Sequence, residues 1–109
     1  MGETTGFAVV LVTASGLEEG NKITSTILER RLAACVNIVP KISSLFWWQG
    51  KIDVADEVLL IIKTRASRVK DIIDVVKSVH SYSVPEVIAL PVMAGHTGYL
   101  DWIAGEVAE

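Results

Sequence analysis

Hydrophobic positions along the chain change their spacing several times, and each change predicts a different element. Residues 7–13 (FAVVLVT) form an unbroken run of apolar and β-branched side chains, which is typical of a strand covered on both faces or lying at the centre of a sheet. After Ser15 the apolar positions recur every three or four residues, which predicts a helix that starts at a capping box from Ser15 to Glu18. The residues on its buried face are Ile23, Ile27, Leu28 and Leu32.

The middle of the chain has the pattern of one long hairpin. Cys35–Val39 is a strand that Pro40 halts or bends, and alternation resumes over residues 42–48. Gln49-Gly50 supplies a tight turn, because glycine accepts the positive φ angle that such turns require. Residues 51–64 return as a strand that is first charged and then apolar. Since an ordinary strand has about 5–6 residues, we expect the outer part of this hairpin to project beyond the rest of the fold.

The second half of the chain continues with a helix, a strand and a helix. Residues 69–79 carry a helical stripe of apolar side chains behind a capping Ser67. Residues 84–92 have the pattern of a last strand. Residues 97–107 then form a final helix, which Thr97 is expected to cap.

The order β-α-β-β-α-β plus one helix predicts an α+β, ferredoxin-like fold with an extended central hairpin and an extra C-terminal helix. We expect one domain over residues 1–109, in which residues 1–6 are a flexible N-terminus. Proline lacks an N–H group and is confined to edge strands and bulges. Pro40, Pro85 and Pro91 all fall in the second and fourth strands, which this fold places at the sheet edges.

Composition argues against two classes of partner. Half of the residues are hydrophobic, but the longest apolar runs fall well short of the ~18 residues that a membrane span needs. The formal net charge is −3 and the Lys and Arg residues are scattered, so the basic stripe of a nucleic-acid-binding protein is missing. A single cysteine cannot form an internal disulfide, which fits a reducing, cytoplasmic location. The high apolar content suggests that some surface is buried against a partner chain.

Five segments together resemble the CutA family of divalent-cation tolerance proteins. They are LAACVNIVP at residues 32–40, W-x-G-x-I at 48–52, E-x-L followed by IKT at 57–64, H-x-Y-x-x-PE at 80–86 and YL-x-WI at 99–103. The resemblance implies a ferredoxin-like homotrimer linked to tolerance of copper and other divalent metals, with kinship to PII signalling proteins and no established enzymatic reaction. Three functions stay open: a metal-binding trimer, a PII-like small-molecule sensor with clefts between subunits, and an assembly scaffold without ligand chemistry.

One segment departs from the family pattern. The family usually has His-Pro-Tyr-Glu where this chain has His80-Ser81-Tyr82-Ser83. The proline that stiffens the turn is absent, and a hydroxyl stands in place of a carboxylate. Glu86 remains as the nearby acid.

Cys35 and His80 are the candidate ligands for copper or another divalent cation. A free cysteine often packs as a small hydrophobe, but its thiolate is also a soft ligand suited to Cu(I). Because the chain has no second cysteine, further ligands would come from His80, Met93 or another subunit. His80 ends the predicted second helix, where it is either a cation that interacts with the helix dipole or a ligand or proton carrier.

A ligand cleft is predicted around Lys63, Tyr82 and Glu86, with His80 beside them. Alternation along the last strand puts Glu86 on an apolar face, where an unpaired carboxylate would be costly. It therefore needs a donor, and Lys63 or Tyr82 is the expected one. Lys63 alternatively extends along the surface to reach solvent or holds an anion.

The projecting hairpin carries the residues expected to form a homotrimer interface. Trp47 and Trp48 face opposite sides of their strand, so at least one lies outside the subunit's own core. With Phe46 they favour a contact with another copy, and Pro91 limits how far a shared strand edge extends.

An enzyme is the less favoured class. Acylphosphatases share this fold and capture phosphate with an arginine after the first strand. Here the corresponding loop is TASGLEEG, which has no arginine and two glutamates that would repel an anionic substrate.

Overall fold

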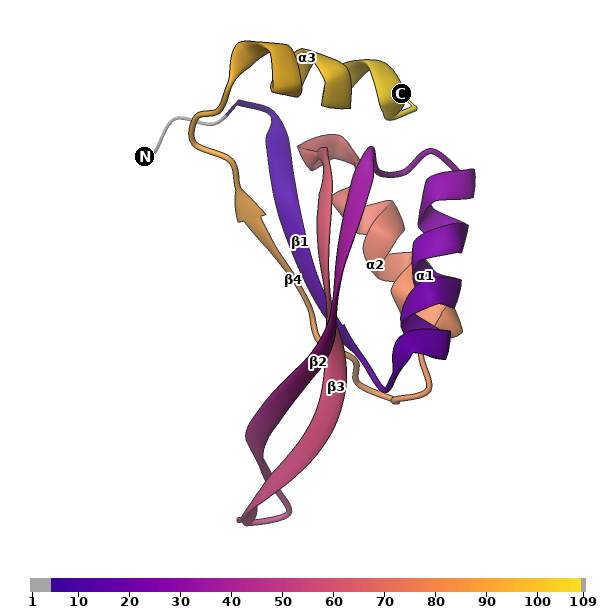
Figure 1. Cartoon of the computed structure of the whole chain (residues 1–109), viewed down its shortest axis with the longest axis vertical. Helices are drawn as coiled ribbons and strands as arrows, with labels where there is room; N and C mark the ends of the chain where they lie inside the picture. The colour runs from indigo at the N-terminus through magenta and orange to yellow at the C-terminus, as the bar shows by residue number, and fades with distance from the viewer. Residues whose placement is uncertain (1–4, 109) are drawn as a thin grey trace.

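The computed structural model describes residues 5–108 and has the predicted order of elements (Figure 1). The elements are β1 (Phe7–Ala14), α1 (Leu17–Glu29), β2 (Cys35–Trp48), β3 (Lys51–Arg65), a 3₁₀ turn (Ala66–Arg68), α2 (Val69–Val79), β4 (Val87–Pro91) and α3 (Thr97–Glu106). The strands form a four-stranded antiparallel sheet in the order β2-β3-β1-β4. This is the ferredoxin-like arrangement, and the predicted α+β fold is confirmed.

The prolines fit the sheet order with one correction. Pro40 lies in edge strand β2, and Pro91 ends edge strand β4, as predicted. Pro85 instead lies in the loop before β4, because that strand begins only at Val87. Glu86 precedes the strand for the same reason.

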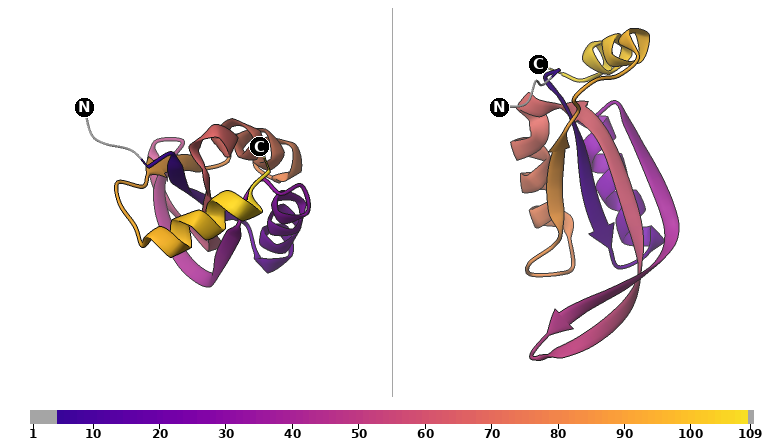
Figure 2. Two further views of the ribbon diagram at one scale, coloured as in Figure 1. Left: turned by 90° about the horizontal axis from the view of Figure 1, so that it is seen from above. Right: turned by 90° about the vertical axis from the view of Figure 1, so that its left-hand side faces the viewer.

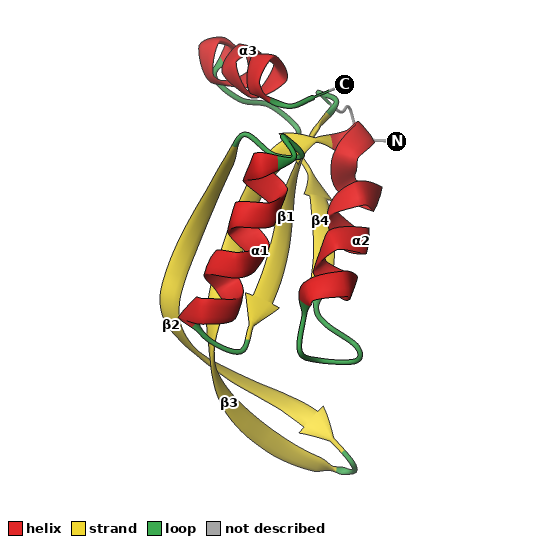
Figure 3. Cartoon of the chain, turned by 90° about the vertical axis from the view of Figure 1, so that its right-hand side faces the viewer, coloured by secondary structure: helices red, strands yellow, loops and turns green. Residues whose placement is uncertain are grey.

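Two helices form a layer on one side of the sheet. α1 and α2 lie side by side on this side, which we call the covered face (Figure 3). Its side chains, among them Val10, Leu60 and Ile62, are fully buried against the helices. The opposite side, which we call the open face, carries half-exposed residues such as Ile88 and Leu90. None of the helices within residues 5–108 is long and apolar enough to cross a bilayer.

The C-terminal helix crosses one end of the sheet (Figure 2). The Arg65 guanidinium donates a hydrogen bond of 2.6 Å to the Ala104 carbonyl oxygen. The Ala108 N–H donates to the Arg31 carbonyl oxygen at 2.8 Å. These bonds fix α3 to the end of β3 and to the loop after α1.

The start of α1 differs from the prediction by one residue. The Ser15 N–H donates to the Glu19 carboxylate at 2.9 Å, so Glu19 takes the place expected of Glu18. The helix follows Gly16, and no side chain caps it. Inside its first turn, a Cβ atom added to Gly20 would lie 2.9 Å from the Val58 side chain. Glycine therefore allows α1 to approach β3 closely.

The other predicted caps and the N-terminus also need correction. Ser67 lies inside the 3₁₀ turn and does not cap α2. α3 is capped by the His96 ring, which accepts the Tyr99 N–H at 3.2 Å, in place of the Thr97 hydroxyl. Within the expected flexible segment, the Thr5 hydroxyl donates to the Val92 carbonyl oxygen at 2.8 Å, and residues 1–4 lie outside the described residues.

The β2–β3 hairpin continues past the helices as a projecting arm, residues 42–57 (Figure 1). Gln49 and Gly50 form its tight turn with φ angles of 50° and 78°, as predicted. The register of β2 shifts around Pro40, whereas β3 pairs without such a shift. The side-chain alternation of β3 therefore continues unbroken from the body into the arm.

Candidate functional site

A polar cluster occupies the base of the arm, and His80 is at its centre. The His80 side chain is fully buried, and its Nε2 lies 2.7 Å from the Thr13 carbonyl oxygen. Its Nδ1 accepts the Tyr82 N–H at 3.0 Å, so we assign the proton to Nε2. Both ring nitrogens are thus engaged in holding the loop after α2. In this chain His80 is a positioning residue and has no free nitrogen for a metal, in contrast to the prediction.

Glu19 links this loop to the start of α1. Its two carboxylate oxygens accept the Ser15 N–H at 2.9 Å and the Ser81 N–H at 2.7 Å, and the His80 Nε2 lies 3.5 Å away. Burial alone would raise the pKa of Glu19, but these hydrogen bonds favour the charged form and lower the pKa to about 2. Glu19 is therefore an ionised clamp between two loops at neutral pH.

Tyr82 connects the same loop to the arm. Its hydroxyl donates to the Glu57 carboxylate at 3.0 Å, and its ring lies 4.6 Å from the His80 ring, centre to centre. Glu57 is nearly buried at the point where β3 leaves the body. Burial and the bond to Glu57 raise the pKa of Tyr82, because both disfavour the phenolate.

The predicted cleft of Lys63, Tyr82 and Glu86 does not form within one chain. Glu86 is exposed before β4, so its carboxylate needs no buried donor. The Lys63 amino group instead donates to the Asn37 side-chain oxygen. Lys63 is six residues from Glu57 along β3, roughly 20 Å at the usual strand rise. Glu57 takes the role that the sequence assigned to Glu86.

Cys35 lies at the far end of the open face from the cluster. It pairs with Lys63 across β2 and β3, and its thiol lies 3.9 Å from the Asn37 side-chain oxygen. Burial and the adjacent Cys35 raise the pKa of Tyr99 on α3. Thr13, which contacts His80, pairs with β3 four residues from Lys63, or about 13 Å along the strand. The two candidate metal ligands therefore do not meet in one chain.

Other acids do not complete a metal site in this chain. Within residues 5–108, His, Cys, Asp and Glu side chains form no group of three that could hold a metal ion. Cys35 itself is half-buried and forms no disulfide.

The arm carries an apolar surface that its own subunit does not cover. Leu45 pairs with Val54 and Trp47 with Ile52, which places all four side chains on one side of the arm. Their exposed fractions are 70%, 58%, 73% and 63%. Val54 and Ile52 continue the alternation of the covered face into a region that the helices do not reach. We call Leu45, Trp47, Ile52 and Val54 the arm patch.

The remaining predicted interface residues lie around this patch. Phe46 and Trp48 are exposed on the other side of the arm, so the two tryptophans face opposite ways as the alternation requires. Pro91 is exposed at the end of edge strand β4. Leu45 and Val54 were missed from the sequence, although their alternation with Trp47 and Ile52 was the available signal.

Comparisons with known proteins agree with this architecture. The family model of the CutA1 divalent ion tolerance protein matches residues 8–106. The chloroplastic protein CutA 1 of Oryza sativa subsp. japonica is 48% identical over 101 residues, which are 93% of this chain and 57% of that protein. The divalent-cation tolerance protein CutA of Archaeoglobus fulgidus is 47% identical over 94 residues, 86% of this chain and 91% of that protein. The chain thus spans little more than half the length of the rice relative.

Solved structures give the same result. The crystal structure of CutA1 from Oryza sativa superposes with a TM-score of 0.93 at 46% identity, covering 97% of each chain. The structure of the periplasmic divalent cation tolerance protein CutA from Archaeoglobus fulgidus has a TM-score of 0.91 at 43% identity, covering 94% of this chain and 99% of that one. Fold, sequence and the family model therefore lead to one conclusion: the chain belongs to the CutA1 divalent ion tolerance family.

Proposed function

We propose that this chain acts in divalent-cation tolerance as a non-enzymatic homotrimer that takes up copper. The arm patch is the observation that carries the proposal. Its four large apolar side chains are more than half exposed in the single chain. Covering one such side chain stabilises an assembly by about 1.5–3 kcal/mol, so an isolated subunit leaves a large favourable contact unmade.

The position of the patch supports a ring of copies. The arm projects away from the helices, whereas the surfaces able to receive it are the open face and the edge of β4. A contact between two different surfaces is heterologous, and such contacts close into a ring when the rotation fits. A ring of three agrees with the homotrimer that the family resemblance implies.

Cys35 is the proposed point of copper uptake. Its thiol is half-buried on the open face, beside the hydroxyl-bearing Tyr99 and the Asn37 side chain. Thiolate sulfur favours Cu(I), and one thiolate does not complete a coordination shell. The proposal therefore places the other ligands on neighbouring copies, which is why trimer formation and copper binding are tested together.

Copper uptake is tested by titration of the purified assembly with Cu(I) under anaerobic conditions. We predict that Cys35→Ser weakens binding at least tenfold, equivalent to about 1.4 kcal/mol. Ser25→Ala, an exposed side chain on α1 in the helix layer, serves as the control. Circular dichroism of both variants verifies the fold. Equal Cu(I) affinity in wild type and Cys35→Ser would contradict the assignment.

A PII-like small-molecule sensor is the second candidate. It is favoured by the polar cluster at the arm base, where the exposed Tyr82 ring and the Glu57 carboxylate would adjoin a neighbouring copy. Saturable binding of a metabolite without metal, lost in Tyr82→Phe, would support this candidate over copper uptake. The cytoplasmic location also stays a proposal, supported by the single free cysteine.

A further inference from the structure

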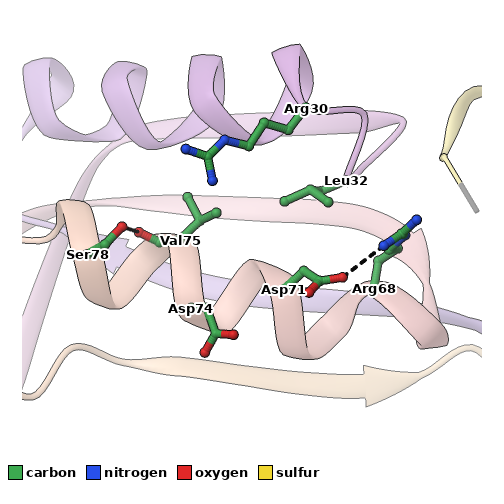
Figure 4. A pocket seen from close by; sticks show the side chains of 7 residues that line it. All are labelled: Arg30, Leu32, Arg68, Asp71, Asp74, Val75 and Ser78. Carbon is green, nitrogen blue, oxygen red and sulfur yellow. Dashed lines mark hydrogen bonds and ion pairs between the residues drawn. The ribbon is translucent and has the colours of Figure 1, made fainter.

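A groove on the outer side of the helix layer is not used by the proposed function. It lies between the C-terminal end of α1 and the length of α2, and its volume is about 360 Å³ (Figure 4). This is at the lower end of the ~300–1,000 Å³ typical of small-molecule sites. The groove is on the side of the helices, away from Cys35 and the arm patch, so a ligand there would not compete with either.

The groove has an apolar floor. Leu32, from the loop after α1, and Val75, from α2, line it and belong to the hydrophobic core. Their side chains are almost fully buried, so they form a fixed surface rather than mobile rim groups. Such a floor favours a ligand with an apolar body.

Most of the charged side chains around the groove already pair with another group. Asp71 pairs with Arg68 at 3.0 Å, and Asp74 pairs with Lys70 at 3.3 Å. Arg68 also donates to the Ala108 carbonyl oxygen at 2.7 Å. Both acids and Arg68 thus have partners already.

Arg30 differs from these residues. It extends from the end of α1 over the groove, above Val75 and toward Ser78 (Figure 4). Within residues 5–108 its guanidinium makes no ion pair or hydrogen bond. The groove therefore presents one unmatched positive charge over an apolar floor.

We propose that this groove binds a small organic anion whose carboxylate pairs with Arg30 and whose apolar body rests on Leu32 and Val75. A guanidinium matches a carboxylate with two parallel N–H···O bonds. Ser78 donates its hydroxyl to the Val75 carbonyl oxygen at 2.8 Å, which leaves the hydroxyl oxygen at the groove as an acceptor only. The ligand is thus expected to present its carboxylate to Arg30 and not to Ser78.

The test is an NMR titration of the 109-residue chain with three probes. Benzoate carries both the charge and the apolar body, benzyl alcohol lacks the charge, and acetate lacks the apolar body. We expect saturable shifts at the groove with benzoate, and at least tenfold weaker binding of each of the other two. Arg30→Gln should weaken benzoate at least tenfold, whereas Lys22→Gln, an exposed charge on the same helix outside the groove, should leave it unchanged.

Three results would overturn the proposal. They are the absence of saturable benzoate binding, equal benzoate affinity in wild type and Arg30→Gln, and acetate binding as tightly as benzoate. Because the Arg30 guanidinium is exposed and has no partner within residues 5–108, the Arg30→Gln variant is expected to fold. Arg30→Lys, which keeps the charge but loses the bidentate geometry, should bind benzoate with intermediate affinity.

Discussion

The β2–β3 hairpin has two halves with the same alternation and very different surroundings. In the body, Leu60 and Ile62 of β3 are fully buried beneath the helices. In the arm, Ile52 and Val54 continue the same side of the same strand and are more than half exposed. The apolar side of β3 therefore continues past the part of the strand that the helices cover. The body buries its apolar side chains in its own core, and this difference supports the proposal that the arm contacts another copy.

We expect the largest loss of stability from a substitution in the body. Leu60→Ala removes a fully buried side chain and leaves a cavity in the core, which typically costs about 2–5 kcal/mol of stability. The loss should appear in the free energy of unfolding, measured by denaturant titration, at every protein concentration. Val54→Ala, on the exposed half of the same strand, is the matched control. An equal, concentration-independent loss in both variants would remove the distinction between body and arm.

A substitution in the arm patch is expected to weaken the assembly of copies. Trp47→Ala removes the most exposed side chain of the arm patch, and buried tryptophans at interfaces typically contribute about 2–4 kcal/mol. We expect the proposed trimer of this variant to dissociate at a concentration at least tenfold higher than that of wild type. Lys51→Ala, on the other side of the arm tip, should leave assembly unchanged. Sedimentation velocity across a dilution series makes the comparison, and equal dissociation of the two variants would contradict a role for the patch.

The clamp at the arm base is expected to give a smaller, pH-dependent effect. The pKa of Glu19 is lowered to about 2 in the folded chain from an ordinary value of 4.5. Its stabilisation, up to about 3 kcal/mol, is therefore fully present above pH 4.5 and is lost as the pH falls toward 2. Glu19→Gln should lose this stability at pH 7 and differ little from wild type near pH 2. The free energy of unfolding of both proteins is measured at each pH. A difference between Glu19→Gln and wild type that stays constant from pH 7 to pH 2 would exclude the clamp.

The smallest effect concerns the residue that departs from the family pattern. Ser81→Pro restores the usual proline but deletes the N–H that donates to Glu19 at 2.7 Å. A hydrogen bond to a charged group is worth about 1.5–3 kcal/mol, partly offset here by the stiffer loop. We expect a net loss near 1 kcal/mol and a higher pKa of Glu19 by NMR titration. Ser81→Ala keeps the N–H but removes the hydroxyl, whose hydrogen bond also lowers the pKa of Glu19, so this pKa should rise in both variants. The effect of the N–H is the difference between Ser81→Pro and Ser81→Ala.

Much of the fold followed from changes in hydrophobic period. The long hairpin, its turn at Gln49-Gly50 and the bend at Pro40 were each predicted from local chemistry and are present. The capping residues of the helices were not, because the donor that needs a cap is fixed locally but its acceptor depends on tertiary position. Glu19 and His96, rather than the predicted residues, occupy those places.

The site was less predictable because it joins elements distant in sequence. Tyr82 was expected to meet Glu86, four residues away, but the loop directs its hydroxyl to Glu57 on the arm. The available signal was that Glu57, the second of two adjacent acids, stands directly before the apolar run at residues 58–62. For Lys63, no sequence pattern indicated that Asn37 would be its partner across the strands.

Sedimentation equilibrium at micromolar concentration measures the mass of the assembly that the arm is proposed to form. We predict a single species of three times 11.8 kDa, with loss of folded structure rather than a folded monomer on further dilution. Tryptophan fluorescence of that species should report Trp47 shielded from a soluble quencher. A folded species of 11.8 kDa with fully quenched tryptophans would contradict both the trimer and the explanation of the arm.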